Sequence, residues 1–260
     1  GANPNLLDFN GTPSIIPAVI HGNFEICEWL IRKGANLNIT DNLDRTPLMY
    51  AVFYNDILLT DLFIYYAADV NLTDNKGNTA LNIAAYYGYT EIVKLLAENK
   101  ATLDKPNKQN FTPLHSACMM GRNEVIRYLL SQGAGTTQKT NAGYTPLALA
   151  VYNNHYDAVD LLISNGADVN GKVAIATSPL NIAKSNKNDS IAALLSSNGA
   201  EMFRRPAIQY YSINYDLSFG ANDVVMGGGI GMHDTRYGFS ASLGMAARLS
   251  AKPILTETEL

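Results

Sequence analysis

The chain has 260 residues, of which 47% are hydrophobic, and this is enough for one or two domains with a buried core. Its formal net charge is −4 and no stretch forms a basic stripe, so a nucleic-acid partner is not expected. No apolar run reaches the length of a membrane-spanning helix.

The most informative feature of the chain is a period of 33 residues. Two series of alanines keep this step, and aliphatic pairs such as Leu95-Leu96 and Leu161-Leu162 fall between them at nearly the same phase. A fixed period of this length predicts a stacked array of repeats, in which each unit packs only on its neighbours. The first series is Ala18, Ala51, Ala84, Ala117, Ala150 and Ala183, and the second is Ala35, Ala68, Ala101, Ala134, Ala167 and Ala200.

Each period predicts two short helices. A Thr-Pro-Leu-like turn such as residues 112–114 begins the first helix, because Thr caps a helix and Pro suits its first position. Residues 91–96 are typical of the second helix, which is amphipathic. Both helices are expected to end at a residue in the left-handed conformation, which glycine adopts without cost and Asn tolerates. These end positions hold Gly22, Gly34, Gly88, Gly121, Gly133, Gly166, Gly199, Asn55 and Asn154, with Ala67, Lys100 and Lys187 as departures.

These residues resemble the ankyrin repeat. The best copy is residues 111–143, where Thr112-Pro113-Leu114-His115-Ser116-Ala117 matches the family's T-P-L-H-x-A pattern, and residues 166–170 match its hairpin. The resemblance implies an α-solenoid of six ankyrin repeats over residues 11–205. It also implies a hydrogen-bonding role for His115 within the stack, and binding of partners to the hairpin fingertips and to the exposed end of the first, inner helix.

The early part of the chain departs from this pattern. Residues 1–10 resemble the hairpin of the next period, which predicts either the remnant of a preceding repeat or a short hairpin that caps the stack. Trp29 falls at an apolar position of a second helix and is expected in the core, and residues 56–59 are more apolar than the family pattern. Cys27 and Cys118 lie in repeats three units apart, so we expect two buried free thiols and no disulfide.

After residue 205 the period changes from 33 to 2. Apolar residues alternate with small or polar ones in three runs, which predicts a short antiparallel β-meander over residues 206–260, with turns at residues 220–223 and 233–235. Its apolar face has no charge and carries aromatic residues near the strand ends, and in this it resembles strands of an outer-membrane β-barrel. The alternative is a soluble sheet whose apolar face packs on another element. Residues 253–260 begin either a turn or a fourth strand. Three strands cannot close a barrel, so further strands would come from chain beyond Leu260 or from other copies.

The candidate binding site is a strip along the groove of the array. Phe, Tyr and Met stand at the exposed end of the inner helices, where ankyrin repeats usually have polar residues. Exposed apolar strips mark binding surfaces, and Tyr is a common interface anchor, although half of each pair could instead pack against the neighbouring repeat. The candidate residues are Phe53, Tyr54, Tyr86, Tyr87, Met119, Met120 and Tyr152 on the helices and Lys76, Asn107 and Lys139 on the fingertips.

No set of residues predicts catalysis, and no cofactor or metal is expected. Ser116 follows His115 but lacks a positioned acid, and no Cys/His spacing fits a metal site. The sequence therefore predicts a non-enzymatic module that captures a protein or peptide. The tail predicts attachment to a bacterial outer membrane with the array in the periplasm, as a homo-oligomer or in a larger envelope complex. The alternatives are an outer-membrane pore or transport component with the array as plug or regulator, and a soluble cytoplasmic adaptor.

Overall fold

The computed structural model describes residues 3–173, 177–202, 209–219, 224–234 and 239–249, and only the backbone in the last three ranges. The chain divides into two compact units, Gly1–Phe203 and Arg204–Leu260. The boundary between the units lies close to residue 205, where the sequence predicts that the repeats end.

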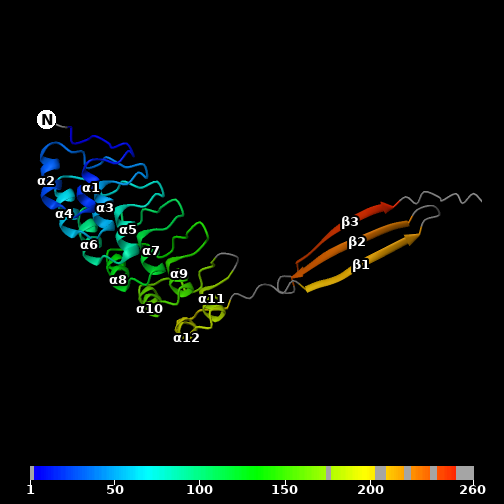
Figure 1. Cartoon of the computed structure of the whole chain (residues 1–260). Helices are drawn as coiled ribbons and strands as arrows, with labels where there is room; N and C mark the ends of the chain where they lie inside the picture. Colours follow the sequence, from blue (N-terminus) through cyan, green and yellow to red (C-terminus); the bar gives the residue numbers. More distant parts are fainter. Residues whose placement is uncertain (1–2, 174–176, 203–208, 220–223, 235–238, 250–260) are drawn as a thin grey trace, which may run out of the picture. The chain divides into compact units, whose positions relative to one another are not determined.

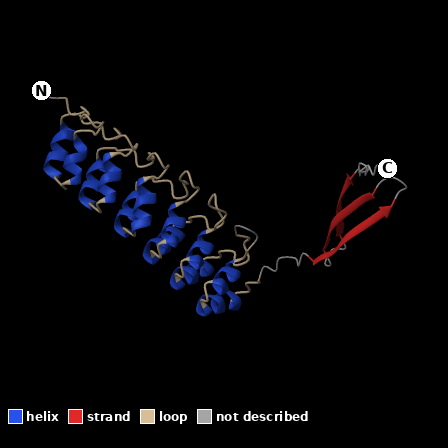
Figure 2. Ribbon diagram, turned by 45° about the vertical axis from the view of Figure 1, so that its right-hand side comes forward, coloured by secondary structure: helices blue, strands red, loops and turns tan. Residues whose placement is uncertain are grey.

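Unit 1 is an array of stacked helix pairs, each an inner and an outer helix joined by a short turn (Figures 1 and 2). Extended loops, here called fingers, connect each outer helix to the next inner helix and line one edge of the stack (Figure 2). In the described chain the inner helices are α1 (Ile15–Ile20), α3 (Pro47–Phe53), α5 (Ala80–Tyr87), α7 (Pro113–Met119), α9 (Pro146–Tyr152) and α11 (Pro179–Ser185). The outer helices are α2 (Phe24–Arg32), α4 (Ile57–Tyr65), α6 (Thr90–Glu98), α8 (Asn123–Ser131), α10 (Tyr156–Ser164) and α12 (Asp189–Ser197).

The inner helices begin where the Thr-Pro-Leu turns predict. From α3 onward the hydroxyl of the N-cap residue accepts a hydrogen bond from the backbone amide three residues later, which satisfies one of the free amides of the first turn. The N-cap residues are Thr46, Thr79, Thr112, Thr145 and Ser178. Helix α1 differs, because Ser14 makes no such bond and its hydroxyl instead donates to the carbonyl of Leu6 at 2.7 Å.

Small side chains let neighbouring inner helices lie close together. Each alanine of the first series is buried, and the residues from Ala51 to Ala183 in this series have no exposed surface. Consecutive inner helices contact one another along the array, so these alanines lie where a helix faces its neighbour. One continuous apolar core therefore runs from α1 to α12.

The left-handed helix ends persist where the sequence lacks glycine. Ala67 has φ +63°, Lys100 has φ +68° and Lys187 has φ +56°. The glycines at the equivalent positions of other repeats also have positive φ. A residue with a side chain pays roughly 1–2 kcal/mol for this conformation. The packing of each helix pair on its neighbours therefore fixes the backbone at these points, and the residue type follows only in part.

A polar ladder ties each hairpin to the next one. Asn5 accepts a hydrogen bond from the amide of Asn36 at 2.6 Å, and Asn71 accepts one from Thr102 at 2.8 Å. Side chains at this position in other repeats, spaced by multiples of 33 residues, accept the equivalent bond from a backbone amide of the next hairpin. The side chains concerned are Asn5, Asn38, Asn71, Asp104 and Asn170.

Neighbouring fingers also join through their backbones. The amide of Lys108 donates to the carbonyl of Lys76 at 2.9 Å, and the amide of Asn141 donates to the carbonyl of Gln109 at 3.0 Å. Gly77 lies at this contact with φ +82°, and a Cβ built on it would lie 2.8 Å from the backbone nitrogen of Lys108. Two fingers can approach this closely only because Gly77 has no side chain.

Unit 2 contains three antiparallel strands in the order β1-β2-β3. They are β1 (Gln209–Phe219), β2 (Val224–Asp234) and β3 (Phe239–Leu249). The register pairs Tyr215 with Gly228 and Gly228 with Met245, and it shifts between Tyr211 and Asn214 on β1. His233 and Asp234 belong to β2, although the sequence places them in a turn. The predicted turn at residues 220–223, and residues 253–260 with their alternative of a turn or a fourth strand, lie outside the described residues.

Trp29 is not in the core, contrary to the prediction. Its side chain is 58% exposed, with the ammonium of Lys33 5.9 Å from its ring centroid. One period later, Leu62 is buried at the same helix position because α4 packs on α2. No outer helix precedes α2 in the described chain, so the apolar position that faces backward along the stack stays open.

We expect Gly77→Ala to destabilise the array more than Gly133→Ala. Gly133 has φ +84°, but a Cβ added to it would meet no atom within 4 Å, so its substitution should cost only the backbone strain of about 1 kcal/mol. Gly77→Ala adds a clash with the next finger and should cost about 1–3 kcal/mol more. Chemical denaturation of both variants measures the difference. Equal losses would show that the fingers do not need their close contact.

Candidate functional site

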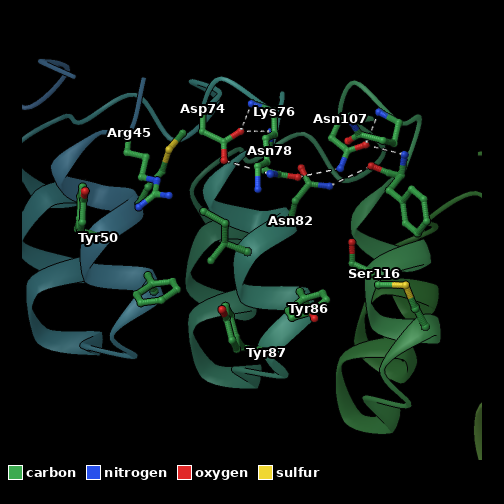
Figure 3. Close-up of a pocket in the computed structure, with 16 residues that line it drawn as sticks. Arg45, Tyr50, Asp74, Lys76, Asn78, Asn82, Tyr86, Tyr87, Asn107 and Ser116 are labelled. Atoms are coloured by element: carbon green, nitrogen blue, oxygen red, sulfur yellow. Dashed lines mark hydrogen bonds between the residues drawn. The ribbon is translucent and has the colours of Figure 1, made fainter. Parts of the chain in front are cut away.

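Unit 1 has a groove between the fingers and the inner helices α3, α5 and α7 (Figure 3). The volume of this groove is about 490 Å³. The helices contribute mostly apolar and aromatic side chains to the lining, namely Met49, Tyr50, Phe53, Ile83, Tyr86, Tyr87 and Met119, together with Asn82 and Ser116. The fingers contribute a mostly polar lining, namely Arg45, Asp74, Lys76, Asn78, Asn107 and Gln109, together with Phe111.

The aromatic side chains of the groove are in contact with one another across the repeats. Phe53 on α3 meets Tyr87 on α5 edge to face, with ring centroids 5.5 Å apart. Tyr86 and Tyr87 form a second such pair at 5.1 Å, and Tyr87 stacks on Tyr89 at 5.5 Å. These contacts restrict the rings while leaving Phe53 45% exposed and Tyr86 and Tyr87 36% exposed. The strip is thus a partly ordered apolar surface that remains open to a ligand.

The polar side of the groove is held by a chain of hydrogen bonds (Figure 3). Asp74 accepts bonds from the amides of Lys76 and Asn78 at 2.9 and 2.8 Å, which closes the fingertip turn. Asn107 donates to the side chain of Asn78 at 2.8 Å, and Asn82 donates to the carbonyl of Phe111 at 3.2 Å. The fingertips therefore keep a fixed position relative to the aromatic strip.

Tyr50 and Arg45 close the groove on the side of the second repeat. The hydroxyl of Tyr50 donates to Asp41 at 2.7 Å, and the guanidinium of Arg45 lies 5.8 Å from the Tyr50 ring centroid. Burial and the bond to the Asp41 carboxylate raise the pKa of Tyr50 above its ordinary value. Tyr50 therefore remains a neutral hydrogen-bond donor near neutral pH.

Six of the ten candidate residues from the sequence line this groove, namely Phe53, Tyr86, Tyr87, Met119, Lys76 and Asn107. Tyr54 and Met120 follow the last residues of α3 and α7 as C-caps, and they do not line the groove. The ring centroids of Tyr54 and Phe53 are nevertheless only 5.2 Å apart. Tyr152 belongs to a later repeat and contacts Tyr144. Lys139 lines a separate hollow of about 370 Å³ beside Thr145 and Lys172.

The sequence does not predict the part of the groove beside the first turns of α3 and α5. Met49, Tyr50, Ile83 and Phe111 line it but were not predicted as site residues. The period offers a signal for some of them, because Tyr50 and Ile83 stand 33 residues apart at the same helix position. Which of these positions faces the groove depends on how the fingers fold back over the helices.

A family model described as ankyrin repeats (three copies) matches the chain in overlapping segments, residues 1–74, 51–140, 102–173 and 132–206. These segments span the chain from residue 1 to residue 206 of 260. The chain belongs to the ankyrin repeat family. Among curated proteins, no match to the chain was found.

Ankyrin arrays are protein-interaction modules and are generally non-enzymatic. His115 and Ser116 are both buried, and both ring nitrogens of His115 are engaged within the ankyrin stack. The described residues contain no group of three or more His, Cys, Asp or Glu side chains that could hold a metal ion. In the same part of the chain, no helix is both long and apolar enough to cross a membrane.

The buried thiols follow the prediction for this family fold. Cys27 and Cys118 are free and have no exposed surface. Burial raises the pKa of Cys27 to about 11, and burial also raises the pKa of Cys118. A protonated, inaccessible thiol is a poor nucleophile, so both side chains serve the core of the ankyrin array.

His115 completes a reciprocal cap at the start of α7. Its Nδ1 accepts from the amide and the hydroxyl of Thr112 at 3.2 and 2.7 Å, so its Nε2 carries the proton that is donated to the carbonyl of Gln138 at 3.0 Å. One period earlier, Asn82 forms the same box with Thr79. The neutral imidazole is therefore the form that fits the ankyrin stack.

We expect the ankyrin array to lose stability as the pH falls from about 6.5 to about 4. Burial lowers the pKa of His115 from its ordinary 6.5 to about 4. As the pH falls below 6.5, His115 becomes protonated in the unfolded chain before it does so in the folded chain. The free energy of unfolding therefore keeps the full contribution of the neutral His115 above pH 6.5 and loses about 3 kcal/mol between pH 6.5 and pH 4. His115→Asn copies the box of Asn82 without a titrating group. Urea unfolding at several pH values should show a steeper loss for the wild type, and parallel curves would contradict this assignment.

Proposed function

We propose that this ankyrin chain captures a protein or peptide segment in the groove formed by α3, α5, α7 and their fingers. The observation that supports the proposal is the aromatic strip of Phe53, Tyr86 and Tyr87, which lines the groove and stays more than a third exposed. Tyrosine offers a large amphipathic surface and loses few rotors on binding, so it anchors a partner at low entropic cost. No catalytic step is part of the proposal.

The groove also offers directional contacts beside the apolar strip. Lys76 is exposed, and its ammonium forms no ion pair with a described residue. Asn78 and Asn107 line the fingertip side of the groove, and the Asn107 side chain donates to that of Asn78 at 2.8 Å, which gives this side a fixed polar surface. The proposed ligand therefore places apolar side chains against the helices and polar groups against the fingers, as interfaces commonly do.

We further propose that residues 206–260 attach the array to an outer membrane, with the ankyrin groove in the periplasm. Support comes from the alternation of apolar and small or polar residues in this part of the sequence and from the length of its strands, 11 residues each. A transmembrane β-strand needs about 9–11 residues. A pore with the array as plug or regulator, and a soluble adaptor, are the competing functions.

We expect Tyr86→Ser with Tyr87→Asn to weaken groove binding without unfolding the array. The replacements copy Ser185 and Asn186, which occupy the same two positions in the last repeat. A peptide selected from a displayed library on the intact chain should lose about 1–2 kcal/mol of affinity per anchor in titration calorimetry. The control is Tyr156→Ala, an exposed tyrosine on the outer helix α10 that does not line the groove. Equal affinity of the groove variant and the wild type would exclude the groove as the binding surface.

For the membrane proposal, we expect the intact chain to float with lipid vesicles and to resist alkaline extraction. Leu217→Lys should weaken this association, because a lysine on the lipid side of a barrel strand costs about 2–4 kcal/mol at the bilayer midplane. Ser218→Lys, on the opposite set of the alternation, is the matched control. A chain that stays soluble and lipid-free would favour the adaptor. Single-channel conductance of the inserted chain would favour the pore.

A further inference from the structure

The outer surface of α4 differs from that of the other outer helices. The position of Leu58 holds an acidic residue or serine in each of the other described repeats, namely Glu25, Glu91, Glu124, Asp157 and Ser190, and all six side chains are exposed. The position of Tyr65 holds Arg32, Glu98, Ser131, Ser164 and Ser197, and these are exposed too. Packing of the stack does not explain an apolar residue at either point, because the other repeats form the same stack with polar ones.

These apolar side chains form one face. Leu58 and Tyr65 are seven residues apart on α4, so they lie on the same side of the helix, about 10 Å apart along its axis. Leu58 is 68% exposed and Tyr65 is 79% exposed. Tyr66 meets Tyr65 edge to face at 5.1 Å and extends the surface at the end of the helix. Leu58, Tyr65 and Tyr66 are here called the α4 face.

The surroundings of the α4 face carry more carboxylates than cations. Helices α2 and α6 contact α4 on its two sides (Figure 1). Arg32 and Lys94 are each engaged with a carboxylate of their own helix, at 2.7 and 2.9 Å, and Arg32 also interacts with Tyr66. Lys33, at the end of α2, is exposed, and its ammonium lies 5.9 Å from the Trp29 ring centroid. The remaining acidic side chains are exposed and form no ion pair with a described residue. These are Glu25 on α2, Asp61 on α4 between Leu58 and Tyr65, and Glu98 on α6.

We propose that the α4 face is a second binding surface, which takes a cationic amphipathic helix from another protein. Such a helix would place leucine-like side chains against Leu58 and Tyr65 and lysine or arginine beside Glu25, Asp61 and Glu98. The acidic rim disfavours an anionic lipid surface, and two α4 faces brought together would oppose their Asp61 carboxylates. The surface lies on the outer helices, away from the groove, so it is independent of the proposed function of the groove. Together the two surfaces would let one chain join two partners.

The test uses the intact chain and a synthetic helix of about 14 residues with leucine on one side and lysine on the other. We expect binding that weakens with salt, and no comparable binding of the same helix with glutamate in place of lysine. Leu58→Glu with Tyr65→Ser restores the residues of other repeats and should reduce affinity by about tenfold or more. Asp61→Lys, which copies Lys94, should weaken the lysine helix and strengthen the glutamate helix. The groove variant Tyr86→Ser with Tyr87→Asn should bind like the wild type.

Three results would overturn the proposal. The first is equal affinity of the lysine helix for the wild type and for Leu58→Glu with Tyr65→Ser, when thermal melting shows both folded. The second is a dimer of the intact chain in sedimentation that this variant abolishes, which would make the face a contact between copies. The third is binding of the intact chain to anionic vesicles that depends on Leu58 and Tyr65, which would assign the face to a lipid surface.

Discussion

Burial between neighbouring helix pairs is the interaction on which the whole array depends. A single pair cannot cover its own apolar side, so each one is stable only against the next. The alanines at Ala51, Ala84 and Ala117 make this contact close, and their complete burial leaves no room for a larger side chain. The caps, the left-handed helix ends and the finger contacts all serve to repeat the same geometry at every step.

The packing between repeats fixes the residue type at a few positions of each repeat, and the other positions are free to vary. The end of the inner helix is such a position, and there the array changes from Phe53 and Tyr86 to Ser185. The outer surface is another, where Leu58 replaces the usual acid. At the end of the inner helix the apolar residues run from Phe53 to Tyr152, whereas the apolar residues of the outer surface, Leu58 and Tyr65, belong to the second repeat. The two candidate binding surfaces therefore come from positions that the stacking of the repeats does not fix.

Most of the array could be predicted from the sequence because its determinants are local. Thr112 caps the helix that follows it, and a glycine or asparagine at a fixed distance ends the next one, so both are visible in the period. The exposure of Trp29 could not be predicted from the sequence. The spacing of apolar residues shows which side of a helix is apolar, but not whether a neighbouring helix covers that side. The groove was predicted only in part for a related reason. Tyr50 and Phe111 reach it through the fold of the fingers over the helices, which no local pattern encodes.

The ladder of hairpin side chains has one missing step. Asn5, Asn38, Asn71 and Asp104 each bind the next hairpin, and Asn170 does so again, but Thr137 occupies the intervening position and makes no such bond to the hairpin that follows. Cooperativity in a linear array depends on the coupling between neighbours, so it is weakest where a link is absent. The fourth and fifth repeats are therefore joined by the packing of α9 on α7 and of α10 on α8, and by the bond from His155 to the carbonyl of Met119, without the hairpin bond that the other junctions have. If that bond adds to the coupling, backbone amides on the two sides of Thr137 exchange with solvent at different rates.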